Sequence, residues 1–537
     1  MAGEMSLDAV IVGAGFSGLY MLHRLRQQGL SARVYEAGTG VGGTWYWNRY
    51  PGARVDIESQ EYSYSFSPEL DEEWVWSERY ATQPELLKYL NHVADRFDLR
   101  RDVQFETRVT AAHFDEATSR WSVTNDRGEV ATARYCIMAT GCLSVANEPS
   151  FPGADSFQGP TWRTGSWPKE GVDFTGQRVA VIGTGSSAIQ SIPRIAAQAD
   201  HVTVFQRTPN FSVPAHNGPR DPAVVADWAN NRAQYRAEAR DTGFGIRMVA
   251  QGEQAALDAT PEERRAEFER RWQIGGFALL GAFADLITDT TANDTAAEFV
   301  REKIRGIVKD PETAEKLAPK SFPIGSKRLC VDTDYYATFN RDNVSLVDLR
   351  DEPIEAITAT GVTTSAQAYA ADTIVYAIGF DAMTGALGKI DIQGRGGQTL
   401  TDQWAAGPRT YLGLMIAGFP NLFIVTGPGS PSVLCNMAVA IEQHVEWISD
   451  CIQYLGQRQL GAIEATAAAQ DEWVAHVNEV ADTTIYPLGN SWYLGANVPG
   501  KPRVFMPYIG GFPVYRDKCN AVAANGYEGF ALSSDAR

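Results

Sequence analysis

The stretch DAVIVGAGFSGLYMLHRL, residues 8–25, decides the fold of this chain. Its apolar run predicts a buried strand, and the amphipathic residues at its end predict a helix. Of the glycines between them, Gly13 permits a tight turn, Gly15 lets the backbone approach a pyrophosphate, and Gly18 allows close helix packing. The next strand, in ARVYEAG, ends at Glu36, which can accept hydrogen bonds from ribose hydroxyls. The unit predicts a dinucleotide-binding fold.

A second copy of this pattern begins with QRVAVIGTGSSAIQSIPRI, residues 177–195. Its turn replaces the third glycine by Ala188, which the motif tolerates. The strand in HVTVFQRTPNF then ends at Gln206 and Arg207, so a cation stands where the first unit has an acid. A cation there accommodates a 2′-phosphate and favours NADPH over NADH. Two different dinucleotides in one chain imply FAD that is reduced by NADPH.

Two further strands end in similar tripeptides, ATG at 139–141 and AIG at 377–379, where we expect the chain to cross between the two units. Between residues about 220 and 320 the chain is rich in Ala, Glu, Arg and Asp with helical spacing. We therefore predict an α/β fold with two Rossmann-like domains and a helical insertion. The FAD domain takes residues 1–144 and 381–537, the NADP domain residues 145–219 and 321–380, and the insertion residues 220–320.

The composition excludes several classes of function. The 65 acidic and 47 basic side chains give a net charge of −18, which argues against a nucleic-acid surface. The N-terminus has no export pattern, and no apolar run reaches the length of a membrane span. The six cysteines lack CxxC spacing, so neither a metal site nor a disulfide framework is indicated, and disulfide reductases are excluded because the first cysteine is Cys136. We expect a cytoplasmic monomer.

Five segments carry a family resemblance: GGTWYWNRYPGARVD at 42–56, ATQPELLKYLNHVADRFDLR from 81, KRLCVDTDYYATFNRDNVSLVD from 327, GPGSPSVLCNM from 427, and SWYLGANVPGKPRVF from 491. In these and over essentially its whole length the chain resembles the Baeyer–Villiger monooxygenases, most closely the phenylacetone and steroid monooxygenase branch. The resemblance implies oxidation of a ketone to an ester or lactone with NADPH and O2. It also implies a flavin C4a-peroxide, which the bound oxidised nicotinamide shields.

The resemblance assigns the catalytic roles to Arg328, the cation that stabilises the peroxide, and to Asp56, the carboxylate that orients it. Lys327 and Arg207 would hold the NADPH 2′-phosphate, and Trp492 resembles a mobile-loop indole that contacts the nicotinamide nucleotide. The turns and the resemblance together place the following residues around FAD: Gly13, Gly15, Phe16, Ser17, Gly18, Glu36, Gly43, Thr44, Trp45, Trp47, Asp56, Tyr62, Val109 and Met437. Around NADP they place Arg54, Thr184, Gly185, Ser186, Ser187, Gln190, Gln206, Arg207, Thr208, Lys327, Arg328 and Trp492.

Two residues depart from the family pattern. Arg163 stands where the fingerprint Phe-x-Gly-x-x-x-His-x-x-x-Trp-Pro has His, in the segment 157–168. Arg does not deprotonate in proteins and has a longer, forked donor, which puts the coupling of NADPH oxidation to oxygen insertion in doubt. Cys142 stands where the closest relatives carry Gln. We expect it to reshape the cofactor or substrate environment.

Three alternative functions stay open at this point. The chain could oxidise a soft nitrogen or sulfur centre, it could be an NADPH oxidase uncoupled by Arg163, or it could bind flavin without turnover as a sensor or scaffold. We expect the loop 427–437 to line the substrate pocket, although Met437 suits the core equally well. Aryl-alkyl, cyclic and steroid ketones all remain possible substrates.

Overall fold

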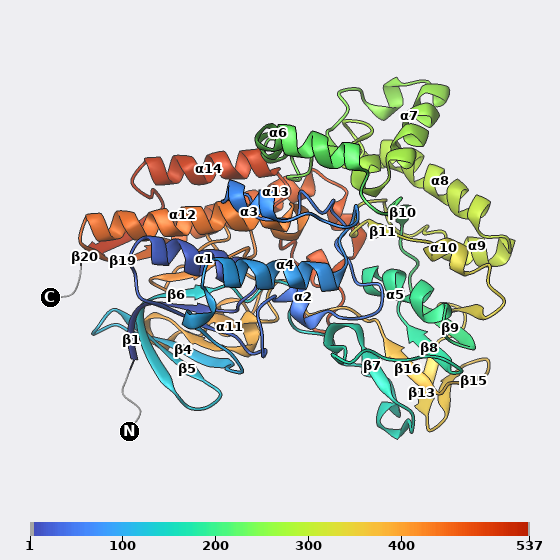
Figure 1. Ribbon diagram of the computed structural model, residues 1–537, viewed down its shortest axis with the longest axis horizontal. Helices are drawn as coiled ribbons and strands as arrows, with labels where there is room; N and C mark the ends of the chain where they lie inside the picture. Colours follow the sequence, from blue (N-terminus) through green and yellow to red (C-terminus); the bar gives the residue numbers. More distant parts are fainter. Residues whose placement is uncertain (1–4, 535–537) are drawn as a thin grey trace.

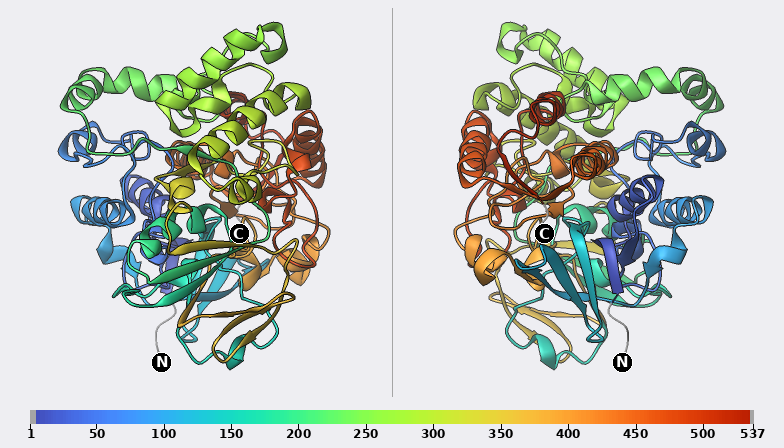
Figure 2. Two further views of the ribbon diagram at one scale, coloured as in Figure 1. Left: turned by 90° about the vertical axis from the view of Figure 1, so that its right-hand side faces the viewer. Right: turned by 90° about the vertical axis from the view of Figure 1, so that its left-hand side faces the viewer.

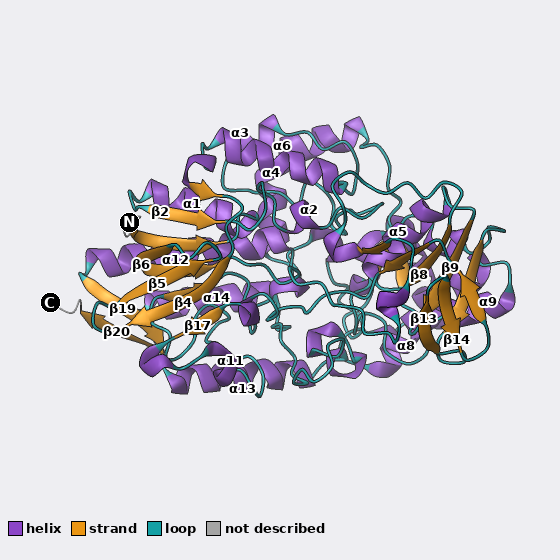
Figure 3. Cartoon of the chain, turned by 90° about the horizontal axis from the view of Figure 1, so that it is seen from below, coloured by secondary structure: helices purple, strands orange, loops and turns teal. Residues whose placement is uncertain are grey.

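The chain folds around two sheets that lie at opposite ends of the molecule, with loops and helices between them (Figures 1 and 3). A computed structural model describes residues 5–534, so the first four and the last three residues of the predicted FAD domain lie outside it. The predicted α/β class with two nucleotide-binding units is confirmed. The exact domain boundaries stay a prediction.

The first sheet contains the N-terminal dinucleotide unit. Strands β3, β2, β1 and β6 are adjacent and parallel, β18 pairs with the end of β6, and β5, β4 and β17 extend the sheet on the other side. Val10 and Ile11 are fully buried, as expected of a parallel strand covered on both faces. The strands are β1 (Met5–Val12), β2 (Ala32–Tyr35), β3 (Val103–Gln104), β4 (Val109–Asp115), β5 (Arg120–Asn125), β6 (Val130–Met138), β17 (Asp391–Gln393) and β18 (Leu422–Ile424).

The second sheet is parallel throughout, in the order β12-β9-β8-β16-β7. These strands are β7 (Thr161–Arg163), β8 (Arg178–Ile182), β9 (His201–Gln206), β12 (Val344–Asp348) and β16 (Thr373–Tyr376). Smaller sheets join β10 (Ser212–Pro214) to β11 (Cys330–Asp332), β13 (Ile354–Thr358) to β14 (Gly361–Thr364) and β15 (Ala368–Ala370), and β19 (Leu460–Ala465) to β20 (Phe530–Ser534).

Helices cover the sheets and form the region between them. Helix α1 follows the first Gly-rich turn and lies beside α12, and α5 follows the second turn (Figure 1). The helices outside the insertion are α1 (Phe16–Gln27), α2 (Thr44–Trp47), α3 (Pro68–Glu73), α4 (Gln83–Arg96), α5 (Ser186–Ala196), α10 (Tyr335–Thr338), α11 (Leu400–Gln403), α12 (Met437–Gln457), α13 (Ala467–Asp482) and α14 (Phe512–Ala524). Within residues 5–534, no helix is long and apolar enough to cross a membrane.

The helical insertion contains α6 (Pro222–Arg240), α7 (Pro261–Ile274), α8 (Thr290–Ile307) and α9 (Pro311–Leu317), and lies at the top of both views in Figure 2. The local sequence explains where each helix begins. Asp221, Thr260, Asp289 and Asp310 each accept a hydrogen bond from the first turn that they cap. Three of these caps are followed by proline, whose fixed φ suits the first helical position.

The two Gly-rich turns are built alike. Gly13 and Gly183 have φ of +105° and +114°, a region that side chains disfavour. A Cβ on Gly13 would lie 2.6 Å from the carbonyl oxygen of Ala139, and one on Gly183 would lie closer still to that of Ala377. The tripeptides ATG and AIG therefore press against the turns of their own units, which brings both chain crossings next to the nucleotide turns.

A buried imidazole links β18, α12 and α14. The Nδ1 atom of His444 accepts from the backbone N–H of Thr426 at 2.9 Å, so the ring proton is on Nε2, 3.0 Å from the hydroxyl of Tyr515. That hydroxyl in turn donates to the carbonyl of Leu412. Burial lowers the pKa of His444 to about 3. The network thus requires a neutral imidazole, because a second ring proton would face the N–H of Thr426.

We expect this imidazole to make the protein acid-labile. The pKa of His444 is lower in the folded chain than the 6.5 of an ordinary His. Its contribution to the free energy of unfolding is therefore complete above pH 6.5 and is lost as the pH falls toward 3. At pH 5 the free energy of unfolding is lower by about 2 kcal/mol from this imidazole than it is above pH 6.5. His444→Gln should be less stable than the natural protein at pH 7.5, and this gap in Tm should narrow by pH 5. His201→Gln, at a half-buried imidazole in β9 whose partner is the hydroxyl of Ser345, is the matched control. A His444→Gln gap that is independent of pH would contradict the prediction.

Candidate active site

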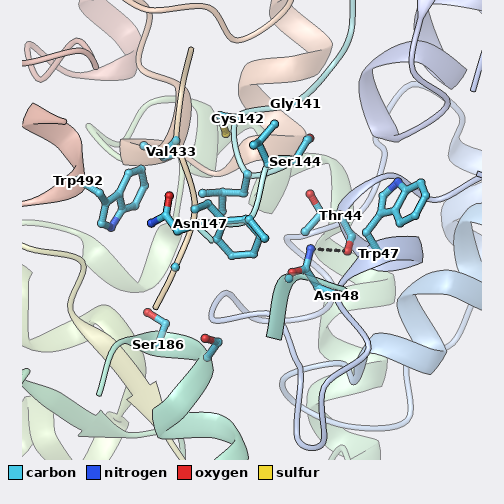
Figure 4. A pocket seen from close by; sticks show the side chains of 18 of the residues that line it. Thr44, Trp47, Asn48, Gly141, Cys142, Ser144, Asn147, Ser186, Val433 and Trp492 are labelled. Atoms are coloured by element: carbon cyan, nitrogen blue, oxygen red, sulfur yellow. Dashed lines mark hydrogen bonds between the residues drawn. The ribbon is translucent and has the colours of Figure 1, made fainter. Parts of the chain in front are cut away.

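One cavity of about 1470 Å³ is lined by both Gly-rich turns. Its walls also include the aromatic segment after α1 and β2, the crossings at 139–151 and 377–380, and residues around Val433 and Trp492. Figure 4 shows Thr44 and Trp47 on one side of this cavity and Trp492 on the other, with Ser186 of the second turn below them. The volume exceeds that of an ordinary single-ligand pocket and accommodates two dinucleotides.

At the first turn, Glu36 ties the strand end to the Gly-rich loop. Its carboxylate accepts from the backbone N–H groups of Ala14 and Gly38, each at 2.8 Å. Burial raises the pKa of Glu36, and the two backbone donors partly offset this effect. Each oxygen retains a lone pair after these bonds, so the carboxylate can still accept from a ribose hydroxyl. This arrangement fits the FAD end of the cavity.

At the second turn, Arg207 and Lys327 line the same part of the cavity. Burial lowers the pKa of Lys327, and the neighbouring charge of Arg207 lowers it further. Within residues 5–534, neither cation forms an ion pair with a carboxylate. Two adjacent cations without a counter-charge form a suitable site for a phosphate dianion. The hydroxyl of Thr184 donates to the carbonyl of Thr208 at 2.8 Å and fixes the turn beside them.

Arg328 and Asp56 meet in the cavity, as the resemblance implies. The Nε and Nη2 atoms of Arg328 donate to the two carboxylate oxygens of Asp56 at 2.9 and 2.8 Å, and Nη1 donates to the carbonyl of Val433 at 2.8 Å. Burial opposes the positive charge, but Asp56 and Tyr493 outweigh it and raise the pKa of Arg328 above its usual range. The arginine side chain is 22% exposed, which leaves part of the guanidinium open to the cavity.

Sequence reasoning missed the contributions of Tyr493 and Val433. Tyr493 is buried beside Arg328, and burial raises the pKa of its hydroxyl to about 12 although Arg328 acts in the opposite direction. The only sequence signal for Tyr493 was its position next to Trp492. Val433 contributes a backbone carbonyl, and the side-chain pattern carries no signal for that.

Most of the predicted site residues line the cavity. From the FAD set these are Gly13, Gly15, Phe16, Ser17, Glu36, Gly43, Thr44, Trp45, Trp47, Asp56, Tyr62, Val109 and Met437, and from the NADP set Arg54, Thr184, Gly185, Ser186, Ser187, Gln190, Arg207, Thr208, Lys327, Arg328 and Trp492. Gly18 lies outside this lining, in α1, where a Cβ would collide with the carbonyl of Gly13, so it acts through packing. Gln206 is also outside, fully buried, and donates to the carbonyl of Lys316 at 2.7 Å.

The two departures from the family pattern both lie at the cavity. Arg163, at the end of β7, forms an ion pair with Glu148 in the crossing segment. Cys142 is buried, and burial raises the pKa of its thiol to about 11. Figure 4 shows Cys142 next to Gly141, above Asn147 and Val433. The neutral thiol therefore contributes an apolar surface there, where Gln would offer an amide.

Comparison with known proteins identifies the family. A family model described as pyridine nucleotide-disulphide oxidoreductase matches residues 10–272. The chain is 44% identical to a Baeyer–Villiger monooxygenase of Pseudooceanicola batsensis, with 97% of this chain and 95% of that protein covered. It is also 44% identical to a methyl acetate-forming acetone monooxygenase of Gordonia sp. (98% and 99% covered) and to a phenazine N-monooxygenase of Lysobacter antibioticus (98% and 97% covered).

Solved structures agree over the whole chain. An oxidised steroid monooxygenase bound to NADP superposes with a TM-score of 0.95 and 55% identity, covering 99% of this chain and 100% of that one. The OTEMO complex with FAD and NADP gives a TM-score of 0.95 at 42% identity, covering 98% and 99%. The first turn with Glu36 suits FAD, and the second turn with Arg207 and Lys327 suits NADP. The chain therefore belongs to the Baeyer–Villiger monooxygenases and is an enzyme that uses FAD and NADPH.

Proposed function

We propose that this enzyme converts ketones to esters or lactones with NADPH and O2, and that Arg328, oriented by Asp56, is the cation at the reacting centre. The observation that carries the proposal is the two-point ion pair between these side chains in the cavity that both nucleotide turns line. When bound, FAD reduced by NADPH supplies the electrons that activate dioxygen.

The geometry of Arg328 suits it to stabilise negative charge on oxygen. Its hydrogen bonds to Asp56 and Val433 use three of the five guanidinium N–H groups, and the hydroxyl of Tyr493 interacts with it as well, which leaves one donor for a reacting oxygen. The guanidinium stays protonated throughout because its pKa is far above neutrality. Fixed donors are most effective in a site from which water is excluded, so Arg328 can stabilise the charge that develops when a carbonyl is attacked.

Apolar side chains support a ketone substrate. Cys142, Val433 and Tyr493 belong to one buried cluster near Arg328, which also includes Leu434, Tyr486, Phe505 and Met506, with Met437 and Trp492 packed against it. Of these side chains, Cys142, Val433, Met437 and Trp492 line the cavity, so they offer an apolar wall to a ketone while Arg328 faces its oxygen. We further propose that Trp492, which lines the cavity, would help to hold the oxidised nucleotide and so keep water away from the reacting centre.

Oxidation of nitrogen is the second candidate function. The Lysobacter relative named phenazine N-monooxygenase is as similar to this chain as the ketone-oxidising relatives are. An uncoupled NADPH oxidase is the third, because Arg163 replaces a family His and pairs with Glu148.

We also propose that the protein is a cytoplasmic monomer. Its net charge of −18 favours solubility through mutual repulsion.

The proposal is tested with purified FAD-loaded protein by following NADPH, hydrogen peroxide and product together. Phenylacetone, cyclohexanone, a steroid ketone and phenazine form the substrate panel. We expect one ester or lactone per NADPH for at least one ketone. Phenazine N-oxide as the sole product would support the second candidate instead. Peroxide in place of product with every substrate, reversed by Arg163→His, would support the third.

Loss of the cation should stop oxygen insertion without preventing cofactor binding. In Arg328→Ala we expect FAD to bind and NADPH to reduce it, while ester formation falls by about 100-fold or more, the usual effect of removing an oxyanion donor. Stopped-flow flavin absorbance and gas chromatography measure the two steps. Arg341→Ala, at the exposed surface, is the matched control. Undiminished ester from Arg328→Ala would remove Arg328 from the reacting centre.

The two cations at the second turn should determine the choice of nucleotide. Arg207→Ala and Lys327→Ala should each raise the KM for NADPH about 10- to 100-fold, because a charge-assisted hydrogen bond to the 2′-phosphate is lost. The KM for NADH, which has no such phosphate, should change little. Steady-state assays with both nucleotides provide the comparison, and equal rises for both would argue against a phosphate site.

A further inference from the structure

We propose that Phe277, in the helical insertion, is a positioning residue for Arg328. The inference rests on the proposed role of Arg328 and adds a contact that places the insertion next to the chemistry. Phe277 is the second residue of a short 3₁₀ helix after α7, Gly276–Gly281, and is 4% exposed. It does not belong to the residues that line the cavity, whereas Arg328 does, so its contact with the arginine is the link to the reacting centre that we propose.

The guanidinium of Arg328 lies over the phenyl ring of Phe277. The central carbon of Arg328 lies 4.7 Å from the ring centroid, within the range of a cation–π contact. Asp56 and Val433 accept from the guanidinium edge, in its plane. A ring packed against the guanidinium restrains its movement, and it favours the cation without neutralising it. A second carboxylate at that position would cancel the charge that the reaction needs.

The backbone before Phe277 aims the ring at the arginine. Gly275 and Gly276 both have positive φ, and a Cβ on Gly275 would lie 2.5 Å from the carbonyl of Pro214. Two side chains hold the end of α7 at this turn: Arg79 donates to the carbonyl of Ile274 at 2.9 Å, and His216 donates to that of Trp272 at 2.9 Å. The turn is therefore a fixed feature of the fold.

One segment of the FAD-binding unit is linked both to Arg328 and to the turn that presents Phe277. Asp56 binds Arg328 directly, while Glu58, two residues further on, pairs with Arg79 at 2.7 Å. Arg79 in turn holds the Gly275–Gly276 turn that presents Phe277. These contacts form a closed circuit from Asp56 through Arg79 and Phe277 to Arg328. A shift of the insertion relative to the segment that contains Asp56 would therefore move the phenyl group away from the guanidinium.

Fluorinated phenylalanines introduced at position 277 alone test the electrostatic role with little change of shape. Successive fluorines weaken the negative potential of the ring face. We expect ester formed per NADPH to fall stepwise, by about threefold to tenfold for the fully fluorinated ring, with hydrogen peroxide rising to match. The KM for NADPH should stay unchanged, and the Tm should fall only slightly, because the weakened contact also contributes to stability. The same series at Phe283, a buried ring of the insertion that packs against Phe268, is the matched control.

Phe277→Leu and Arg328→Met, alone and together, give a second measurement that needs no turnover. If the ring contacts the cation, the losses in Tm should be non-additive. Additive losses, or unchanged coupling across the fluorinated series in an enzyme that makes ester, would overturn the role of Phe277. Absence of ester from the natural protein and from the Phe283 series would instead contradict the proposed function. A non-additive Tm would then still support the Phe277–Arg328 contact.

Discussion

Asp56 and Arg328 are separated by 272 positions in the chain, yet their side chains form a two-point ion pair in the cavity. Asp56 follows the first dinucleotide unit, and Arg328 follows the helical insertion. A partly buried cation needs a fixed partner because desolvation of an unpaired charge is costly. The pair can form only when these two regions approach correctly, so one interaction joins the geometry of the fold to the electrostatics of the site.

The two nucleotide units have the same backbone turn but end the following strand with residues of opposite charge. In each, a glycine at positive φ lies against the carbonyl of an alanine at the end of a neighbouring strand, Ala139 in one and Ala377 in the other. The backbone can therefore approach a pyrophosphate in both turns. They differ at the end of the next strand, where the first unit has Glu36 and the second has Arg207. That difference in charge suits the two units to distinct nucleotides.

The helical insertion contributes more than a covering layer. Through Phe277 it contacts the arginine that the FAD-binding segment orients, and through Arg79 it is anchored to that same segment. The crossing segments add further links, since Arg163 at the end of β7 pairs with Glu148. Contacts of this kind connect the relative position of the units to the arrangement of the reacting groups.

The sequence by itself determined the α/β class, the two dinucleotide units and the choice of FAD and NADPH. These features depend on local patterns, namely the glycine spacing and the residue that ends the following strand. Only the tertiary structure decided that Val433, Tyr493 and Phe277 surround Arg328, and that Gln206 donates to Lys316 instead of lining the cavity. Such contacts join residues far apart in the chain or use backbone atoms, and their geometry arises only when the sheets and the insertion pack together.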